Sequence, residues 1–234
     1  MKLSEATIGV LKNFASINPS VLFQPGNEIR TVSPQKTVMA KATVEETFPV
    51  EGAIYDLGRF LGVLSLFNDP DLIFHDNQVE VREGRKNIKY TFADKQMIIA
   101  PPEKEINFPE PEVNVNVPWA EFNAVLKASA VLGLPEIAFE GKDGEMLISA
   151  IDSKNPTADT YSSAIGETAD DYRFVFRVEN LKVLNMDYNV SLSDKGIARF
   201  ISVNNDDKDF RDSKLFGVAM DYFVATEVNS TFTS

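Results

Sequence analysis

His75 is the only histidine in the sequence, and it ends a short apolar run, DLIFH, with Asp71 and Asp76 close by. An imidazole beside a carboxylate has the chemistry of a general base. A serine hydrolase would also need a serine in a G-x-S-x-G elbow, and a thiol enzyme or a two-histidine metal site would need a cysteine or a second histidine, none of which the sequence contains. We therefore interpret His75 as an ordinary histidine, and we expect no metal ion or other cofactor.

The sequence also contains no glycine-loop motif of the kind that cradles phosphates. The nearest glycine cluster, GKDGE at 141–145, is typical of a hairpin turn. The acidic run NNDDKD at 204–209 lacks the turn glycine and distal glutamate of a calcium loop, so we interpret it as a solvated loop. The 35 acidic residues leave accidental carboxylate pairs open, which keeps a polysaccharide hydrolase as the enzyme alternative. With no positive sign of catalysis, we expect a protein that is not an enzyme.

Basic residues are more informative than their number suggests, because each of four predicted helices carries one away from its apolar stripe or at its edge: Lys12, Arg59, Lys127 and Lys182. Long cationic side chains can contact phosphates without reading bases. Any surface helix can carry a lysine, so the pattern alone leaves an ordinary solvated face as the alternative.

Helical periodicity predicts the elements that would position these cations. Helices are expected over Ser4–Ile17, from Asp56 as N-cap, from Pro118 in a first turn, and briefly near 179–184. Strand-like runs fill the remainder: 21–24, 28–32, 37–44, 46–50, 71–75, 79–82, 87–92 and 97–100, then 112–117, 136–139, 146–151, 160–165, 172–178, 188–193, 197–203, 214–220 and 222–228.

The chain divides at residues 101–111, PPEKEINFPEP, whose four prolines exclude a helix or a central strand. We place an N-terminal domain at 1–100, a linker at 101–112 and a C-terminal domain at 113–234. The helix starts near 4, 56, 118 and 178 recur after the linker, which predicts a repeated unit of a helix followed by strands. Each half, with several strands and short one-sided helices, fits an α+β domain.

Composition agrees with a folded cytoplasmic protein. The 234 residues are 44% hydrophobic, carry a net charge of −12 and include no cysteine, which excludes a disulfide scaffold and argues against disorder. No segment holds about 18 uncharged apolar residues, so neither a membrane span nor a secretory signal is expected.

Two stretches, MKLS…LKNFASIN (1–18) and AIYDLGRFLGVLSLFND (53–69), closely resemble the sliding clamps, or DNA polymerase processivity factors, of T-even-type tailed bacteriophages. Weaker likeness continues at 122–139, 180–185 and 222–234. The resemblance implies two processivity-fold (DNA clamp) domains per chain, in a head-to-tail homotrimeric ring with antiparallel sheets outside and helices inside. It also implies that double-stranded DNA is encircled without sequence preference, and that the DNA-facing residues are Lys12, Arg59, Lys127 and Lys182.

The same resemblance implies partners in the host cytoplasm: a DNA polymerase, a clamp loader and phage late-transcription factors. Client peptides are expected in an apolar pocket beside the linker, with candidate walls Ile106, Phe108, Phe223 and Ala225. The alternative is that apolar linker residues only hold the linker on a sheet. By order along the chain, the subunit interface is expected to include Asn87, Tyr90 and Phe92 on one edge and Thr160, Ser162 and Ile165 on the other. A β-rich acidic phage virion protein is the alternative function.

Overall fold

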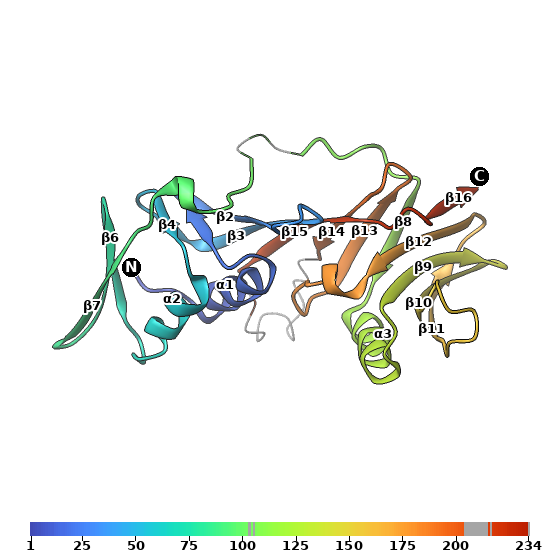
Figure 1. The fold of residues 1–234 in the computed structure, drawn as a ribbon, viewed down its shortest axis with the longest axis horizontal. Helices are drawn as coiled ribbons and strands as arrows, with labels where there is room; N and C mark the ends of the chain where they lie inside the picture. The colour runs from blue at the N-terminus through green and yellow to red at the C-terminus, as the bar shows by residue number, and fades with distance from the viewer. Residues whose placement is uncertain (103, 105, 204–214, 216, 234) are drawn as a thin grey trace. The chain divides into compact units, whose positions relative to one another are not determined.

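The computed structural model describes residues 1–234 except 103, 105, 204–214, 216 and 234. The chain forms two compact units, Met1–Glu105 with Asn204–Asp221, and Ile106–Val203 with Tyr222–Ser234. Both units combine helical segments with antiparallel strands, which confirms the α+β class (Figure 1). This division adds 204–221 to the first unit, which the linear boundaries did not anticipate. The limits 1–100, 101–112 and 113–234 stay a prediction.

The first unit starts with helix α1 (Glu5–Ile17) and continues through strands β1 (Val21–Phe23), β2 (Gly26–Val32), β3 (Val38–Phe48) and β4 (Gly52–Ile54) to helix α2 (Leu57–Leu64). These strands lie side by side in the order β4-β1-β2-β3 and are antiparallel. Helix α1 packs on β3 and on α2. Phe23 and Phe48 stack with their ring centroids 4.6 Å apart, so the helices close over an aromatic core.

A separate three-stranded sheet completes the first unit: β5 (Asp71–His75), β6 (Gln78–Glu83) and β7 (Lys86–Thr91), with β6 in the middle. The strand predicted at 97–100 is wrong, because a 3₁₀ turn, η1 (Lys95–Met97), precedes irregular chain there. The Asp94 side chain accepts a hydrogen bond from the N–H of Gln96 and fixes this turn, which leaves Met97 65% exposed.

The second unit contains β8 (Val113–Val117), helix α3 (Trp119–Leu132), β9 (Glu136–Lys142), β10 (Glu145–Ile151), β11 (Tyr161–Glu167) and β12 (Asp171–Arg177). A 3₁₀ turn, η2 (Val178–Asn180), leads to β13 (Tyr188–Ser193) and β14 (Ile197–Ser202), and the unit ends with β16 (Thr231–Thr233). Strand β15 (Ala219–Ala225) belongs to this unit only from Tyr222 onward.

One sheet of this unit has the order β11-β10-β9-β12-β16, and α3 packs on its β9, β10 and β11 strands (Figure 1). Strand β13 pairs antiparallel with β8 and with β14. The expected turn at 141–145 is confirmed as the β9–β10 hairpin, where Asp143 and Gly144 have φ values of 54° and 88°. Phe122 of α3, Phe139 of β9 and Phe200 of β14 are fully buried and form the centre of the core.

The fourth predicted helix, at 179–184, is wrong. Only η2 is helical there, and 181–184 has no regular structure. The Leu184 N–H donates to the Tyr222 hydroxyl at 3.2 Å, and the Leu184 carbonyl accepts from the Tyr188 hydroxyl at 2.8 Å. These tyrosines satisfy the backbone groups that a longer helix would use.

The predicted strands differ from the structure at three further places. Strands β4 and β16 were not predicted, and the runs 37–44 and 46–50 form the single strand β3. The run 214–220 lies partly outside the described residues.

Candidate DNA-facing surface and partner sites

Helix α1 positions Lys12. Ser4 is the N-cap, and its side chain accepts a hydrogen bond from the N–H of Thr7 at 3.1 Å. The carboxylate of Glu46, on β3, accepts further hydrogen bonds from the Ser4 N–H and the Thr7 hydroxyl, so the sheet fixes the start of the helix. One face of α1, including Val10 and Phe14, is buried, and Lys12 is exposed. The ammonium group of Lys12 is therefore presented to solvent.

Helix α2 positions Arg59 in a similar way. Asp56 is the predicted N-cap, and its carboxylate accepts a hydrogen bond from the Arg59 N–H at 2.8 Å. Leu57, Phe60 and Leu64 are buried, while Arg59 is exposed. The negative cap also suits the positive end of the helix dipole, which stabilises the first turn that carries Arg59.

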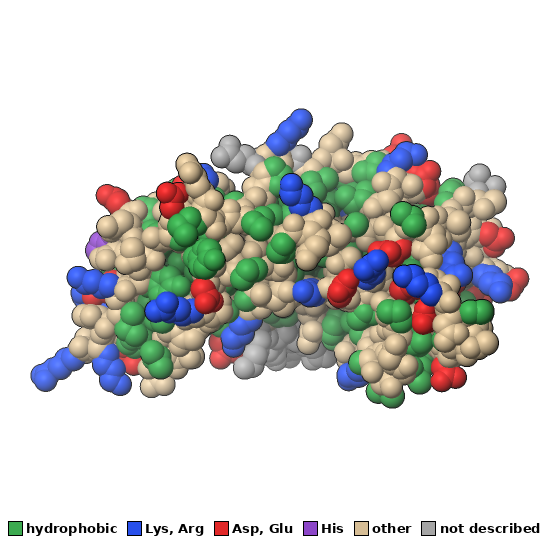
Figure 2. Space-filling view, in the orientation of Figure 1, with side chains coloured by type: hydrophobic (Ala, Val, Ile, Leu, Met, Phe, Trp, Pro, Cys, Tyr) green, Lys and Arg blue, Asp and Glu red, His purple; other side chains and the backbone are tan. Residues whose placement is uncertain are grey.

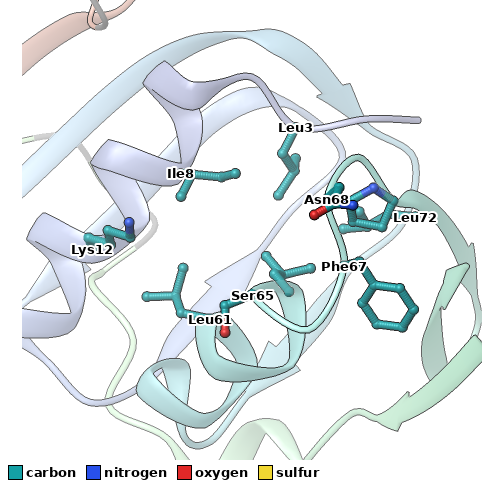
Figure 3. A pocket seen from close by; sticks show the side chains of 10 residues that line it. Leu3, Ile8, Lys12, Leu61, Ser65, Phe67, Asn68 and Leu72 are labelled. Carbon is teal, nitrogen blue, oxygen red and sulfur yellow. The ribbon is translucent and has the colours of Figure 1, made fainter. Parts of the chain in front are cut away.

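A cavity of about 200 Å³ lies between α1 and α2. Figure 3 shows Ile8 and Lys12 of α1 on one side, and Leu61 of α2 with the C-cap residue Ser65 on the other. Most of its walls are apolar, and among the described residues that line it Lys12 is the only charged one. The lining therefore offers no carboxylate to neutralise Lys12.

Helix α3 positions Lys127, which is exposed on the side away from the buried Phe122 and Val125. Pro118 is the N-cap and not a residue of the first turn, a difference of one position from the prediction. Its ring cannot cap the helix. Instead, the carboxylate of Asp187 accepts a hydrogen bond from the Trp119 N–H at 2.7 Å.

Lys182 is exposed, but it follows η2 in irregular chain, so its expected place on a helix is wrong. Its assignment as a DNA-facing residue stays a prediction.

Several surface cations in the chain are already neutralised, such as Lys95 by Glu51 at 2.9 Å and Arg82 by Glu80 at 2.8 Å. In the part of the chain that the structure describes, no ion pair involves Lys12, Arg59 or Lys127. These three cations remain available to an external anion such as a phosphate.

The apolar linker residues lie on the second unit. The rings of Phe108 and Phe223 are 6.2 Å apart, and the Arg199 guanidinium lies 5.4 Å from the centroid of the Phe223 ring. Ile106, Phe108 and Ala225 are half-buried, whereas Phe223 is only 8% exposed. Arg199 is not among the predicted site residues, although the alternation of IARFIS puts it on the face opposite the buried Ala198 and Phe200. The group combines apolar surface with a cation.

The expected interface residues lie at or beside two sheet edges. Strand β7 is an edge strand, with Asn87 exposed. The rings of Tyr90 and Phe60 lie with their centroids 5.2 Å apart, and the Tyr90 hydroxyl donates a hydrogen bond to the Asp56 carbonyl at 3.2 Å. Phe92 follows β7, and its ring lies against Gly52. These two aromatic side chains therefore contribute to their own unit.

The second edge is β11. Thr160 precedes this strand, the hydroxyls of Ser162 and Ser149 are 2.8 Å apart, and Ile165 is half-buried. The assignment of both sets of residues to a subunit interface stays a prediction.

His75 is exposed, with its Nε2 atom 4.0 Å from a carboxylate oxygen of Glu80, which also binds Arg82. Across the described ranges, no cluster of three or more histidine, cysteine or acidic residues could hold a metal ion. Nor is any helix described by the structure long and apolar enough to span a membrane. The run 204–209 lies outside the described residues.

Two family models each match one part of the chain. The family model described as DNA polymerase processivity factor matches residues 2–100, and the model described as gp45 sliding clamp, C terminal, matches residues 115–228. The sliding clamp of Vibrio phage KVP40 is 34% identical, with 97% of this chain and 99% of that one covered. The sliding clamp of Enterobacteria phage T4 is 30% identical, with 99% of both chains covered.

Solved structures show the same fold at low sequence identity. The PCNA of A. fulgidus matches with a TM-score of 0.71 at 16% identity over 98% of both chains. That of Entamoeba histolytica matches with a TM-score of 0.67 at 13% identity over 95% of both chains. These neighbours establish the two-domain clamp fold. Together with the family models and the phage relatives, they show that the chain belongs to the sliding clamps, the DNA polymerase processivity factors of T4-like bacteriophages.

Proposed function

We propose that three copies of this chain close head-to-tail into a ring that encircles duplex DNA and tethers the replicative DNA polymerase in the bacterial cytoplasm. The observation that carries the proposal is the set of exposed cations on the three helices, Lys12, Arg59 and Lys127, each without an ion pair among the described residues. Lys182 is included as a fourth DNA-facing residue.

Sparse cations suit a clamp better than a dense basic patch. Phosphate contacts carry no sequence information and weaken with salt, so a few of them guide the ring without fixing it to one site. The chain has a net charge of −12, which opposes ordinary binding of DNA to its outer surface. Encirclement removes that difficulty because retention is then topological.

A charge reversal tests the DNA-facing assignment. Replacing Lys12, Arg59, Lys127 and Lys182 together by Glu should abolish stimulation of the polymerase on long primed templates. Stability should change by about 1 kcal/mol or less, because exposed substitutions usually act weakly. The matched control replaces Lys36, Lys142, Lys154 and Lys195 by Glu, since these are four exposed lysines outside the helices and outside the proposed docking site. Long synthesis by the helix variant at moderate salt would contradict the proposal.

Clients of the ring, namely the polymerase, the clamp loader and late-transcription factors, are proposed to dock at Ile106, Phe108, Phe223 and Ala225. Support comes from the half-buried Phe108 ring on Phe223, because a few apolar anchors carry most of the energy of such an interface.

Replacing Phe108 and Phe223 by Ala should weaken binding of a polymerase C-terminal peptide at least tenfold while the ring still forms. Fluorescence anisotropy measures the affinity, and the variant Phe67→Ala, at a half-buried phenylalanine of the first unit, is the control. Unchanged affinity in the double variant would place the client site elsewhere.

A further inference from the structure

The edge strand β7 is basic. Together with the turn before it, this strand carries Arg85, Lys86 and Lys89, and residues 84–92 include no acidic side chain. All three cations are exposed, and within the described chain none belongs to an ion pair. Figure 2 shows the blue basic side chains gathered where Figure 1 draws the β6–β7 hairpin. This surface, Arg85, Lys86 and Lys89, is the basic edge.

The acidic residues opposite the basic edge bind elsewhere. Strand register places Glu83 opposite Lys86 and Glu80 opposite Lys89. The Glu83 carboxylate accepts hydrogen bonds from the N–H groups of Asn68 and Asp69, and the Glu80 carboxylate binds Arg82 at 2.8 Å. The carboxylates opposite Lys86 and Lys89 are therefore engaged by other groups, and among the described residues they form no ion pair with either lysine.

The edge strand β11 has the opposite character. Asp159 precedes it, Glu167 ends it, and residues 155–172 contain no lysine or arginine. Glu145 of β10 stands directly opposite Glu167, and all three acidic residues are exposed. Like charges at directly opposed positions destabilise a sheet, and no described cation forms an ion pair with either glutamate. This surface, Glu145, Asp159 and Glu167, is the acidic edge.

Two free sheet edges of opposite charge restrict how copies of the chain can meet. An edge strand exposes unpaired N–H and C=O groups that can pair with another chain. A symmetric contact would place the basic edge on a basic edge, or the acidic edge on an acidic edge, and like charges repel. Only the head-to-tail contact brings a basic edge against an acidic one.

We infer that the basic edge of one copy binds the acidic edge of the next, and that this charge complementarity selects head-to-tail pairing over symmetric dimers. The inference rests on the proposed ring and adds the groups that set its polarity. Because these charges are exposed, salt screens them over about 8 Å at physiological ionic strength, and the ring opens more readily as salt rises.

Three variants test the inference by sedimentation velocity of the full chain at 0.1 M and 0.5 M salt. The first replaces Arg85, Lys86 and Lys89 by Glu, the second replaces Glu145, Asp159 and Glu167 by Lys, and the third combines both sets. At 0.1 M salt, each one-sided variant should raise the ring's dissociation constant at least tenfold. The combined variant should return it to within about threefold of the unmodified chain, because its edges are again opposite in charge. The set Lys36→Glu, Lys104→Glu and Lys195→Glu, at exposed lysines outside both edges, is the control for the net charge of the first variant.

Subunit exchange gives a second measurement. The combined variant should form rings with itself but not mixed rings with the unmodified chain, since every mixed contact joins like charges. Native mass spectrometry of a mixture distinguishes the two kinds of ring. Three outcomes would overturn the inference and leave the proposed ring intact. They are free mixing of the two kinds of subunit, a combined variant that assembles no better than the one-sided variants, and one-sided variants that assemble normally. An unmodified chain that is monomeric or dimeric at tens of micromolar would overturn both.

Discussion

Glu46 connects the sheet to the start of α1, so removing its carboxylate should loosen the helix that carries Lys12. In Glu46→Ala the Ser4 N–H and the fully buried Thr7 hydroxyl lose their acceptor. Hydrogen bonds to a charged group contribute about 1.5–3 kcal/mol, so we expect a loss of about 2 kcal/mol. For a chain of this size that corresponds to a fall of about 4–8 °C in Tm.

The effect should depend on pH. Burial tends to raise the pKa of Glu46, but the hydrogen bonds from Thr7 and Ser4 outweigh burial and hold this pKa below its ordinary value of 4.5. A lowered carboxyl pKa stabilises the folded state above the ordinary value, and this contribution is lost as the pH falls through the folded-state pKa. The difference in stability between the unmodified chain and Glu46→Gln should therefore be largest near pH 7 and shrink below pH 4.5.

Thermal and urea unfolding, followed by circular dichroism at matched protein concentration, measure both effects. Glu45→Gln is the control, because Glu45 is an exposed glutamate next to Glu46 on the same strand. The reasoning is refuted if Glu46→Ala unfolds at the same temperature as the control, or if the Glu46→Gln difference persists unchanged at pH 3.

Two further predictions concern the second unit. Gly133 is the C-cap of α3 and has a φ of 68°, a left-handed conformation that alanine adopts only with strain. Gly133→Ala should therefore lower the free energy of unfolding in urea by about 1 kcal/mol, although no atom lies near enough to obstruct the added methyl group. An unchanged urea midpoint would contradict this prediction. Burial raises the pKa of both Tyr188 and Tyr222 well above the ordinary value of 10, so the stability that their neutral phenols provide is lost as the pH rises above 10. Absorbance at 295 nm should show these phenols ionising only as the chain unfolds, and ionisation of all tyrosines before any loss of circular dichroism would refute the expectation.

Helices α1, α2 and α3 were predictable because each has a wide apolar stripe and a recognisable start. Ser4 and Asp56 act as N-caps, as the sequence indicates. The segment 179–184 has a comparable apolar pattern, but Tyr188 and Tyr222 bind its backbone and prevent a helix. Such long-range hydrogen bonds leave no local signal. The strand predicted at 97–100 is wrong for a related reason. A strand needs a neighbouring strand to pair with, and the apolar residues of the run do not show whether one is present.

The resemblance at 1–18 and 53–69 was sufficient to predict the family, and the family removes the virion-protein and hydrolase alternatives. The interface and partner residues were less predictable, because residue order gives the edges but not the direction of side chains. Tyr90 and Phe92 illustrate this, since both aromatic side chains pack inside their own unit. The charges of Arg85 and Lys86 were visible in the sequence, but their meaning depends on β7 being an edge strand.

The net charge and the exposed helical cations have opposite effects on DNA, and the proposed ring makes use of both. Each chain contributes a charge of −12, so a ring of three carries a strong negative field that repels DNA approaching from outside. Inside the ring, Lys12, Arg59 and Lys127 would face phosphates at short range, where a local cation outweighs distant acidic residues that salt has screened. A clamp with a basic exterior would bind DNA along its outer surface and compete with its own loading. In the proposed ring, the net negative charge would therefore favour DNA that has already been enclosed, and loading rather than affinity would determine where the clamp acts.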